Sequence, residues 1–221
     1  LEKDPSVEAA RQYVAKRLLS RSSVDGFLIG YAPRNGNLVA SAVKKGFALE
    51  ILFKCGLAGK REDGSLRGDY FFDRLMFPIR DVKGGFVGFG GRILGDGEPK
   101  YLNSPESPVF SKSRVLYGLF EGLSDTRKAR RAHLMEGYMD VIASQQHGLK
   151  NACAPLGTAL TAEHAALIKR YVDDAVIVFD ADKAGQNAAV RGGEVALEAG
   201  LRLRIGAVPS GKDPDEFLQT N

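Results

Sequence analysis

Six carboxylate side chains in the C-terminal part of the sequence have the type and spacing needed to bind divalent cations. They form three short clusters, which are Glu136 with Asp140, Asp180 with Asp182, and Asp213 with Asp215. Carboxylates gathered in one place repel one another and raise one another's pKa values unless a cation lies among them. Because all six offer only oxygen ligands, the pattern predicts a site for Mg²⁺ or Mn²⁺.

The acids follow apolar runs that predict buried strands. These runs are residues 132–135, 175–179 and 203–208. Helical stretches are predicted near and between them, over 138–147, 162–171 and 183–199. This alternation is typical of βαβ units with a largely parallel sheet. Since open sheets of this kind bind ligands at the carboxyl ends of their strands, we expect the acids to converge there.

Each cluster also has a purely structural interpretation. Asp182 is a candidate N-cap for the helix predicted from Lys183, and Asp213 for a helix that begins at Pro214. Glu136 and Asp140 are candidate solvated charges. Taken singly, each cluster leaves capping and metal binding open. The joint pattern favours a metal site.

The upstream part of the chain has a different character. A helix is predicted over 7–20, ending near a turn at Ser20–Ser23, then a strand over 27–31 and a β-rich segment over 70–102. We expect two domains, 1–114 and 115–221. The first carries 19 Lys and Arg against 13 Asp and Glu, a net charge of +6, and the second 12 against 14, a net charge of −2. A basic module beside an acidic metal site suits an enzyme that handles a polyanion, although charge alone favours an ordinary soluble surface.

The acidic motifs resemble those of a known family. Glu136–Asp140, Pro155–Thr161, Phe179–Gly185 and Asp213–Asp215 are similar, in order and spacing, to the successive motifs of the Toprim domain of bacterial DnaG-type primases. The resemblance implies an α/β Toprim domain with a largely parallel sheet at the C-terminal end of the chain.

The upstream motifs carry a second resemblance. Gly30–Pro33, Asp73–Ile79, Gly88–Arg92 and Pro99–Glu106 are similar to the primase-specific N-terminal part of the catalytic core. Other Toprim enzymes lack these motifs. The first domain is therefore expected to be a basic, mixed α+β primase subdomain.

The resemblance implies a DNA-directed RNA polymerase, a nucleotidyltransferase that synthesises short RNA primers on single-stranded DNA for replication. Two or more Mg²⁺ or Mn²⁺ ions are implied, with all six acids as ligands and with Glu136, Asp180 and Asp182 as the catalytic group. Glu136 is either a ligand or a general acid/base. The rival functions are a Toprim-type nuclease and a non-catalytic DNA-binding module that retains the fold.

Six residues of the motifs and their surroundings are implied to hold template, primer or nucleotide. They are Arg17, Arg74, Arg92, Lys100, Asn103 and Lys112. Arg17 fits least well, because the family commonly has glycine after this arginine and Leu18 stands there instead.

The implied partners are single-stranded DNA, an RNA primer and ribonucleoside triphosphates. The resemblance assigns helicase docking to a C-terminal domain, and template selection to a zinc-binding domain, that this sequence does not contain. Cys55 and Cys153 lie far apart with no CxxC motif, so no zinc site is expected in this chain. No apolar run reaches the roughly 18 residues of a membrane helix, and we expect a cytoplasmic monomer.

Overall fold

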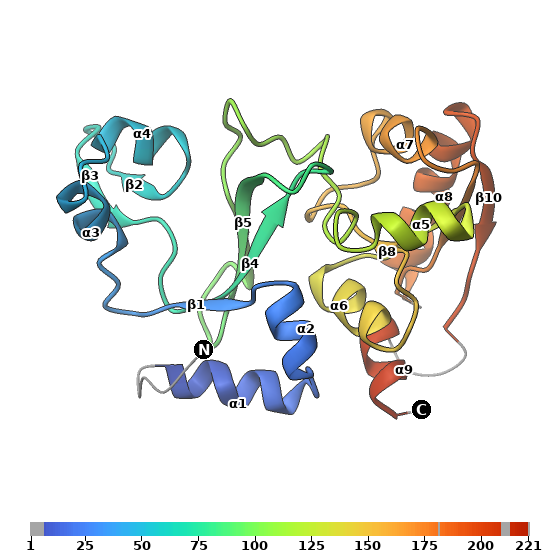
Figure 1. Cartoon of the computed structure of the whole chain (residues 1–221), viewed down its shortest axis with the longest axis horizontal. Coiled ribbons are helices and arrows are strands. Elements are labelled where there is room, and N and C mark those ends of the chain that lie inside the picture. The colour runs from blue at the N-terminus through green and yellow to red at the C-terminus, as the bar shows by residue number, and fades with distance from the viewer. Residues whose placement is uncertain (1–6, 181, 209–212, 221) are drawn as a thin grey trace. The chain divides into compact units, whose positions relative to one another are not determined.

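The computed structural model describes residues 7–180, 182–208 and 213–220, and Figure 1 traces their helices and strands. The chain forms two compact units. Unit 1 comprises the described part of Leu1–Arg17 together with Leu28–Ile79 and Phe86–Ser111. Unit 2 comprises Leu18–Phe27, Arg80–Gly85 and the described part of Lys112–Asn221. The expected division into domains at Arg114 and Val115 stays a prediction.

Unit 1 is a mixed α+β structure. Its elements are α1 (Glu8–Lys16), β1 (Gly30–Ala32), α3 (Leu38–Lys44), α4 (Leu49–Lys54), β2 (Ala58–Lys60), β3 (Leu66–Asp69), β4 (Arg74–Arg80), β5 (Phe86–Ile93) and β6 (Tyr101–Asn103). Four strands form a sheet in the order β1-β4-β5-β6, in which β1 pairs antiparallel with β4 and β5 with β6. Alternate residues of β4, namely Leu75, Phe77 and Ile79, are fully buried, because successive side chains of a strand point to opposite faces.

Unit 2 contains the parallel sheet that the sequence predicts. Its elements are α2 (Arg21–Gly26), α5 (Leu123–Ala129), β7 (Arg131–Leu134), α6 (Tyr138–Gln146), β8 (Ala152–Cys153), α7 (Ala162–Lys169), β9 (Asp174–Ile177), α8 (Lys183–Glu198), β10 (Arg202–Ile205) and α9 (Pro214–Thr220). The strands lie in the order β10-β9-β7-β8, and all three neighbouring pairs are parallel. The predicted fold class, α+β followed by α/β, is therefore confirmed.

The parallel sheet is held by a continuous apolar core. Ala132 and Leu134 of β7 and Ala175 and Ile177 of β9 are fully buried, and they belong to one cluster that includes Ala196 of α8. The register places Leu134 beside Ile177, and Ile177 beside Ile205 of β10. The carboxyl ends of β7, β9 and β10 are thus level with one another.

Three local predictions in the N-terminal part differ from the structure. The helix predicted over 7–20 ends at Lys16, and the strand predicted over 27–31 is β1, which begins only at Gly30. The turn predicted at Ser20–Ser23 is the start of α2. Ser20 caps that helix, because its Oγ accepts a hydrogen bond from the backbone nitrogen of Ser23 at 3.1 Å.

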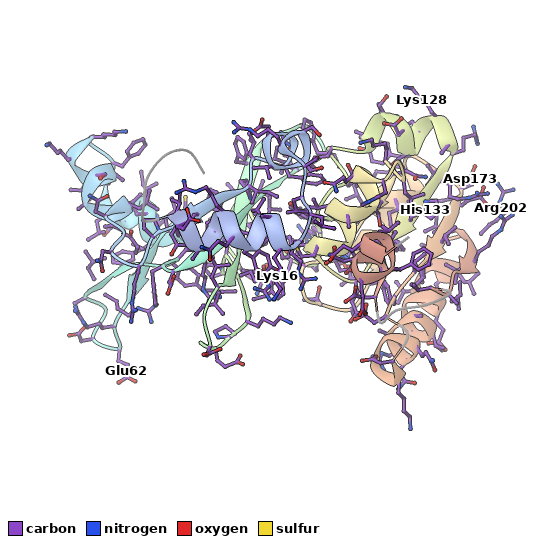
Figure 2. All side chains as sticks on the ribbon, turned by 90° about the horizontal axis from the view of Figure 1, so that it is seen from below. Lys16, Glu62, Lys128, His133, Asp173 and Arg202 are labelled. Atoms are coloured by element: carbon purple, nitrogen blue, oxygen red, sulfur yellow. The ribbon has the colours of Figure 1, made fainter. Side chains whose placement is uncertain are left out.

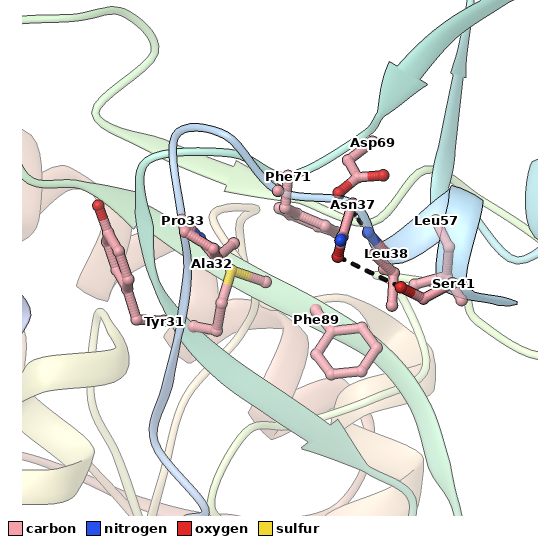
Figure 3. A pocket seen from close by; sticks show the side chains of 12 residues that line it. Tyr31, Ala32, Pro33, Asn37, Leu38, Ser41, Leu57, Asp69, Phe71 and Phe89 are labelled. Carbon is pink, nitrogen blue, oxygen red and sulfur yellow. Dashed lines mark hydrogen bonds between the residues drawn. The ribbon is translucent and has the colours of Figure 1, made fainter. Parts of the chain in front are cut away.

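Unit 1 also contains a hollow of about 410 Å³ that none of the predicted site residues line. Its wall includes Met76 of β4 and Phe89 of β5, and its rim includes Asn37 and Ser41. Figure 3 shows the hydrogen bond between the Ser41 hydroxyl and Asn37 Oδ1 on this rim, at 3.2 Å. None of the helices in the described part of the chain is both long and apolar enough to cross a membrane.

Leu18 occupies the backbone conformation that explains why the primase motif commonly has glycine there. Its φ of 53° lies in the left-handed region, and its side chain is 60% exposed. This conformation costs an L-residue about 1–2 kcal/mol. Glycine avoids that cost but loses roughly 0.5–1 kcal/mol more backbone entropy on folding, which reduces the net gain. Leu18→Gly is therefore expected to raise the free energy of unfolding by about 0.5–1 kcal/mol in urea denaturation. Leu18→Ala keeps the Cβ and should give no gain; an equal gain from alanine would contradict the backbone explanation.

Candidate active site

One acid from each of the first two clusters lies at the carboxyl edge of the parallel sheet. Glu136 follows β7 by two residues, and Asp180 follows β9 by three. The ladder between these strands continues past their ends, because the backbone nitrogen of Val178 donates to the Leu134 oxygen. Glu136 Oε2 then accepts a hydrogen bond from the backbone nitrogen of Asp180 at 3.1 Å. The two predicted acids are thus brought together as the strand order implies.

Asp140 links the first cluster to the third. It lies in the first turn of α6, is 8% exposed, and its Oδ2 accepts from the backbone nitrogen of Gly137 at 3.1 Å. Its Oδ1 accepts from the backbone nitrogen of Asp215, in α9, at 3.4 Å. Asp215 is itself buried, and its Oδ1 accepts from the Gln219 side chain at 2.7 Å. Burial of these two acids excludes the simple solvated-charge interpretation for Asp140.

Asp182 and Asp213 both cap helices, as their structural interpretation predicts. Asp182 Oδ1 accepts from the backbone nitrogen of Gly185 at 2.7 Å at the start of α8. Asp213 Oδ1 accepts from the backbone nitrogen of Glu216 at 2.7 Å at the start of α9. A carboxylate that caps through one oxygen keeps lone pairs for a cation, so capping does not replace the predicted metal role, which stays a prediction.

The acids at this edge raise one another's pKa through electrostatic repulsion. Burial, together with the charges of Asp180 and Asp213, raises the pKa of Asp140 to about 7. Burial, together with the charges of Glu136, Asp213 and Asp182, likewise raises the pKa of Asp180 to about 6. Asp180 Oδ1 is buried and has no hydrogen-bond partner among the described residues. These are the conditions that a bound cation would relieve.

At the opposite end of β9, two acids of the same unit are paired with basic side chains. Asp173 accepts salt bridges from Lys169 at 2.8 Å and from Arg130 at 3.0 Å, and Asp174 accepts two hydrogen bonds from Arg202 at 2.9 and 3.0 Å. Asp173 and Arg202 are labelled in Figure 2. These basic partners lower the pKa of both aspartates. At the carboxyl edge, by contrast, the charges that shift the pKa of Asp140 and Asp180 are negative and raise it.

The site fits a divalent cation in its donor chemistry, in the mutual repulsion of its acids, and in the Asp180 oxygen that has no partner in the described part of the chain. Within the residues that the structure describes, no three His, Cys, Asp or Glu side chains are already gathered as metal ligands. Binding of divalent ions by these six acids is therefore a proposal.

Gly185 holds α8 against the acidic edge. A Cβ at this position would overlap the backbone oxygen of Asp180, so no larger residue fits without moving Asp180. Packing thus requires this glycine, whatever else it does. Gly185→Ala is expected to lower the nucleotide incorporation that the resemblance implies by about 10²-fold, since displacing a positioned group by about 1 Å has that effect. Gly192→Ala in the same helix adds a Cβ that meets only ordinary contacts and should keep activity; equal loss in both variants, measured by radiolabel incorporation, would contradict the close-approach argument.

Five of the six predicted nucleic-acid residues lie in unit 1. Arg17 is the C-cap of α1, Arg92 lies on β5, and Asn103 lies on β6, where it pairs with Gly90. Lys100 is exposed and immediately precedes β6. Lys112 belongs to unit 2. Contact of these residues with nucleic acid or nucleotide stays a prediction.

Arg74 is the member of this set whose surroundings the sequence does not reveal. It is 4% exposed, and burial lowers the pKa of its guanidinium. Its Nη1 donates to the backbone oxygens of Gly91 at 3.1 Å and Pro99 at 2.9 Å, with Lys100 at 3.5 Å. These hydrogen bonds join β5 to the segment before β6, so Arg74 supports the backbone that carries Arg92 and Lys100.

Sequence reasoning also missed two tyrosines that contact Arg92. The Arg92 guanidinium carbon lies 4.3 Å from the centroid of the Tyr13 ring and 5.8 Å from that of Tyr101. Tyr101 pairs directly with Arg92 across β5 and β6. The spacing of Tyr13 and Arg17, four residues apart on a predicted helix, was the available signal.

Two protein-family models match the chain and identify its family. A model described as the DNA primase catalytic core, N-terminal domain, matches residues 1–122, and a model described as Toprim-like matches residues 133–218. The first alone covers more than half of the chain. The chain belongs to the DNA primase catalytic core family. The resemblance stated from the sequence motifs is confirmed, and the two models divide the chain between the basic and the acidic parts.

Individual primases show how much of the protein this chain represents. A DNA primase of Halalkalibacterium halodurans is 40% identical over 213 residues, a match that covers 96% of this chain and 36% of the relative. The chain thus spans about a third of the length of that primase.

Solved primase structures share the fold. The crystal structure of a DNA primase domain from Pseudomonas aeruginosa has a TM-score of 0.88 and 40% identity, over 100% of this chain and 70% of that chain. A structure of a DnaG primase catalytic domain bound to single-stranded DNA has a TM-score of 0.87 and 41% identity, over 99% of this chain and 69% of that chain.

Proposed function

We propose that the chain is the catalytic core of a DNA-directed RNA polymerase, which synthesises short RNA primers on single-stranded DNA. The observation that carries this proposal is the set of mutually repelling acids at the carboxyl edge of the parallel sheet, in a chain of the primase core family. Open parallel sheets bind ligands at this edge. Acids that raise one another's pKa there are suited to holding divalent cations around a triphosphate.

The reaction joins the 3′-hydroxyl of the growing strand to the α-phosphate of a ribonucleoside triphosphate and releases pyrophosphate. Divalent ions bound at the acids would lower the pKa of the attacking hydroxyl, neutralise the triphosphate and stabilise the leaving group. Glu136, Asp180 and Asp182 form the catalytic group, with Asp140, Asp213 and Asp215 as further ligands. The Glu136 carboxylate accepts a hydrogen bond from the backbone nitrogen of Asp180. This bond holds Glu136 beside Asp180, where it can act as a metal ligand or as a general acid/base.

Unit 1 supplies the polyanion-binding part of this proposal. Arg92 and Lys100 bind phosphate oxygens, and Arg74 holds the backbone on which both stand. The related catalytic domain bound to single-stranded DNA supports DNA as the template. The further partners are ribonucleoside triphosphates and the RNA product, and a replicative helicase reached through another part of the primase. We place the protein in the cytoplasm, as a monomer.

An extension assay with single-stranded template, four ribonucleotides and Mg²⁺ or Mn²⁺ tests the proposal. Template-dependent RNA products that vanish when ribonucleotides are omitted support it. Shortening of labelled template without ribonucleotides would identify a nuclease instead. Binding of template with neither product would identify a non-catalytic DNA-binding module. Asp180→Asn serves as the inactive control. Asp173→Asn, which changes a partly exposed acid at the opposite end of β9, serves as the active one.

A further inference from the structure

Tyr13 contacts two of the arginines that the proposed function uses. The Arg92 guanidinium carbon lies 4.3 Å from the centroid of its ring. Arg17 Nε donates a hydrogen bond to its hydroxyl at 3.0 Å, and the Arg17 guanidinium carbon lies 5.6 Å from the same centroid. One tyrosine side chain therefore touches two side chains of like charge, one from the end of α1 and one from β5.

These contacts orient the guanidinium groups without neutralising them. Stacking on an aromatic face attracts a guanidinium through the ring quadrupole and leaves its charge in place. Arg92 is further fixed by Tyr101 on its strand neighbour, at 5.8 Å, and by donation from its Nη1 to the Ile93 oxygen at 3.2 Å. Arg92 Nε is buried and has no hydrogen-bond partner among the described residues. A carboxylate in the place of Tyr13 would hold the arginines equally well but would cancel part of their attraction for phosphate.

We propose that Tyr13 is a positioning residue that holds Arg17 and Arg92 together as one preformed phosphate-binding pair for the single-stranded template. The inference deepens the proposed function and rests on it. Preorganisation matters because arginine has several rotatable bonds, and fixing it before binding removes an entropic loss from the binding step. Tyr13 acts through the two arginines and makes no contact with the reacting atoms.

The structural alternative is that Tyr13 only packs α1 on the sheet. The two roles differ in how Tyr13 couples to Arg17. If its hydroxyl orients Arg17, removal of the hydroxyl matters only while Arg17 is present. If it only packs, Tyr13→Phe keeps the ring and should change nothing, because phenylalanine preserves the contact with Arg92.

A double-mutant cycle on single-stranded DNA affinity tests the proposal, using the 221-residue chain, labelled oligonucleotides and fluorescence anisotropy. Tyr13→Phe is expected to raise Kd about threefold to tenfold, the effect of one orienting hydrogen bond. In an Arg17→Ala background the same change should alter Kd less than about twofold, since coupled residues are not additive. Tyr31→Phe is the matched control, because it removes a hydroxyl that donates to Asp73 in the same unit, at 2.8 Å.

Thermal unfolding of each variant separates an effect on positioning from an effect on stability. Wild-type affinity in Tyr13→Phe would overturn the proposal. An equal loss with and without Arg17 would overturn it too, since Tyr13 would then act independently of that arginine. Failure of the wild-type chain to bind single-stranded DNA would instead overturn the proposed function on which this inference rests.

Discussion

Replacing Asp180 by asparagine is expected to lower primer synthesis by about 10³-fold or more, a rise of roughly 4 kcal/mol in the activation free energy. Asp180 lies three residues beyond β9, and its Oδ1 is buried with no hydrogen-bond partner among the described residues. Burial and the neighbouring carboxylates raise its pKa. Asparagine has the same shape but no charge with which to hold a cation. Affinity for single-stranded DNA should change less than about twofold, because sequence-independent binding comes from cations that contact phosphates.

Extension assays and anisotropy titrations on the same preparation check this prediction. Asp173→Asn provides the control, since that partly exposed acid is paired with Lys169 and Arg130 at the other edge of the sheet. A parallel loss of synthesis and DNA affinity in Asp180→Asn would assign Asp180 to folding instead of catalysis.

Asp140→Asn is expected to make the metal-free protein more stable at neutral pH while it removes activity. The folded-state pKa of Asp140 is raised to about 7 from an ordinary value of 3.8. The native state therefore holds a proton between these values that the unfolded chain has released, and its stability falls as pH rises from about 4 through 7. Three pKa units correspond to at most about 4 kcal/mol. Asparagine is always neutral but has one acceptor oxygen for two backbone donors, so we expect a net gain of about 1–2 kcal/mol at pH 8.

Urea denaturation of both proteins at pH 5 and pH 8, with EDTA and with Mg²⁺, measures this effect. The gain should appear at pH 8 in EDTA, shrink at pH 5, and shrink or reverse in Mg²⁺, because a ligand that binds only the native state stabilises it. Asp173→Asn should show no such gain, because basic partners lower the pKa of Asp173. A pH-independent loss of stability in Asp140→Asn would contradict the electrostatic description of the edge.

Local sequence signals predicted the elements whose causes are local. The apolar run at 175–179 predicted β9, and Asp182 and Asp213 followed by helical sequence predicted two caps that the structure contains. The alternation of such elements was sufficient to predict a parallel sheet and therefore the convergence of Glu136 with Asp180. A strand tip is positioned by the sheet, so its acids can be placed from sequence before any coordinates are known.

Elements stabilised by distant residues were not predicted. The start of α3 is held by Asp69, whose two carboxylate oxygens accept from the backbone nitrogens of Leu38 and Val39, each at 2.8 Å. The sequence next to Leu38 gives no indication that Asp69 caps this helix. Arg74 is a similar case, because its burial depends on backbone oxygens of Gly91 and Pro99. An arginine in a basic segment is ordinarily expected at the surface.

Mn²⁺ positions in crystals of this chain, located by anomalous diffraction, test the central claim most directly. The account predicts one ion within about 2.2 Å of carboxylate oxygens of Glu136, Asp180 and Asp182, with a second ion on the group formed by Asp140, Asp213 and Asp215. The first ion should disappear in Asp180→Asn crystals grown in the same way. Mn²⁺ bound away from these six side chains, in a preparation that synthesises primers, would contradict the account.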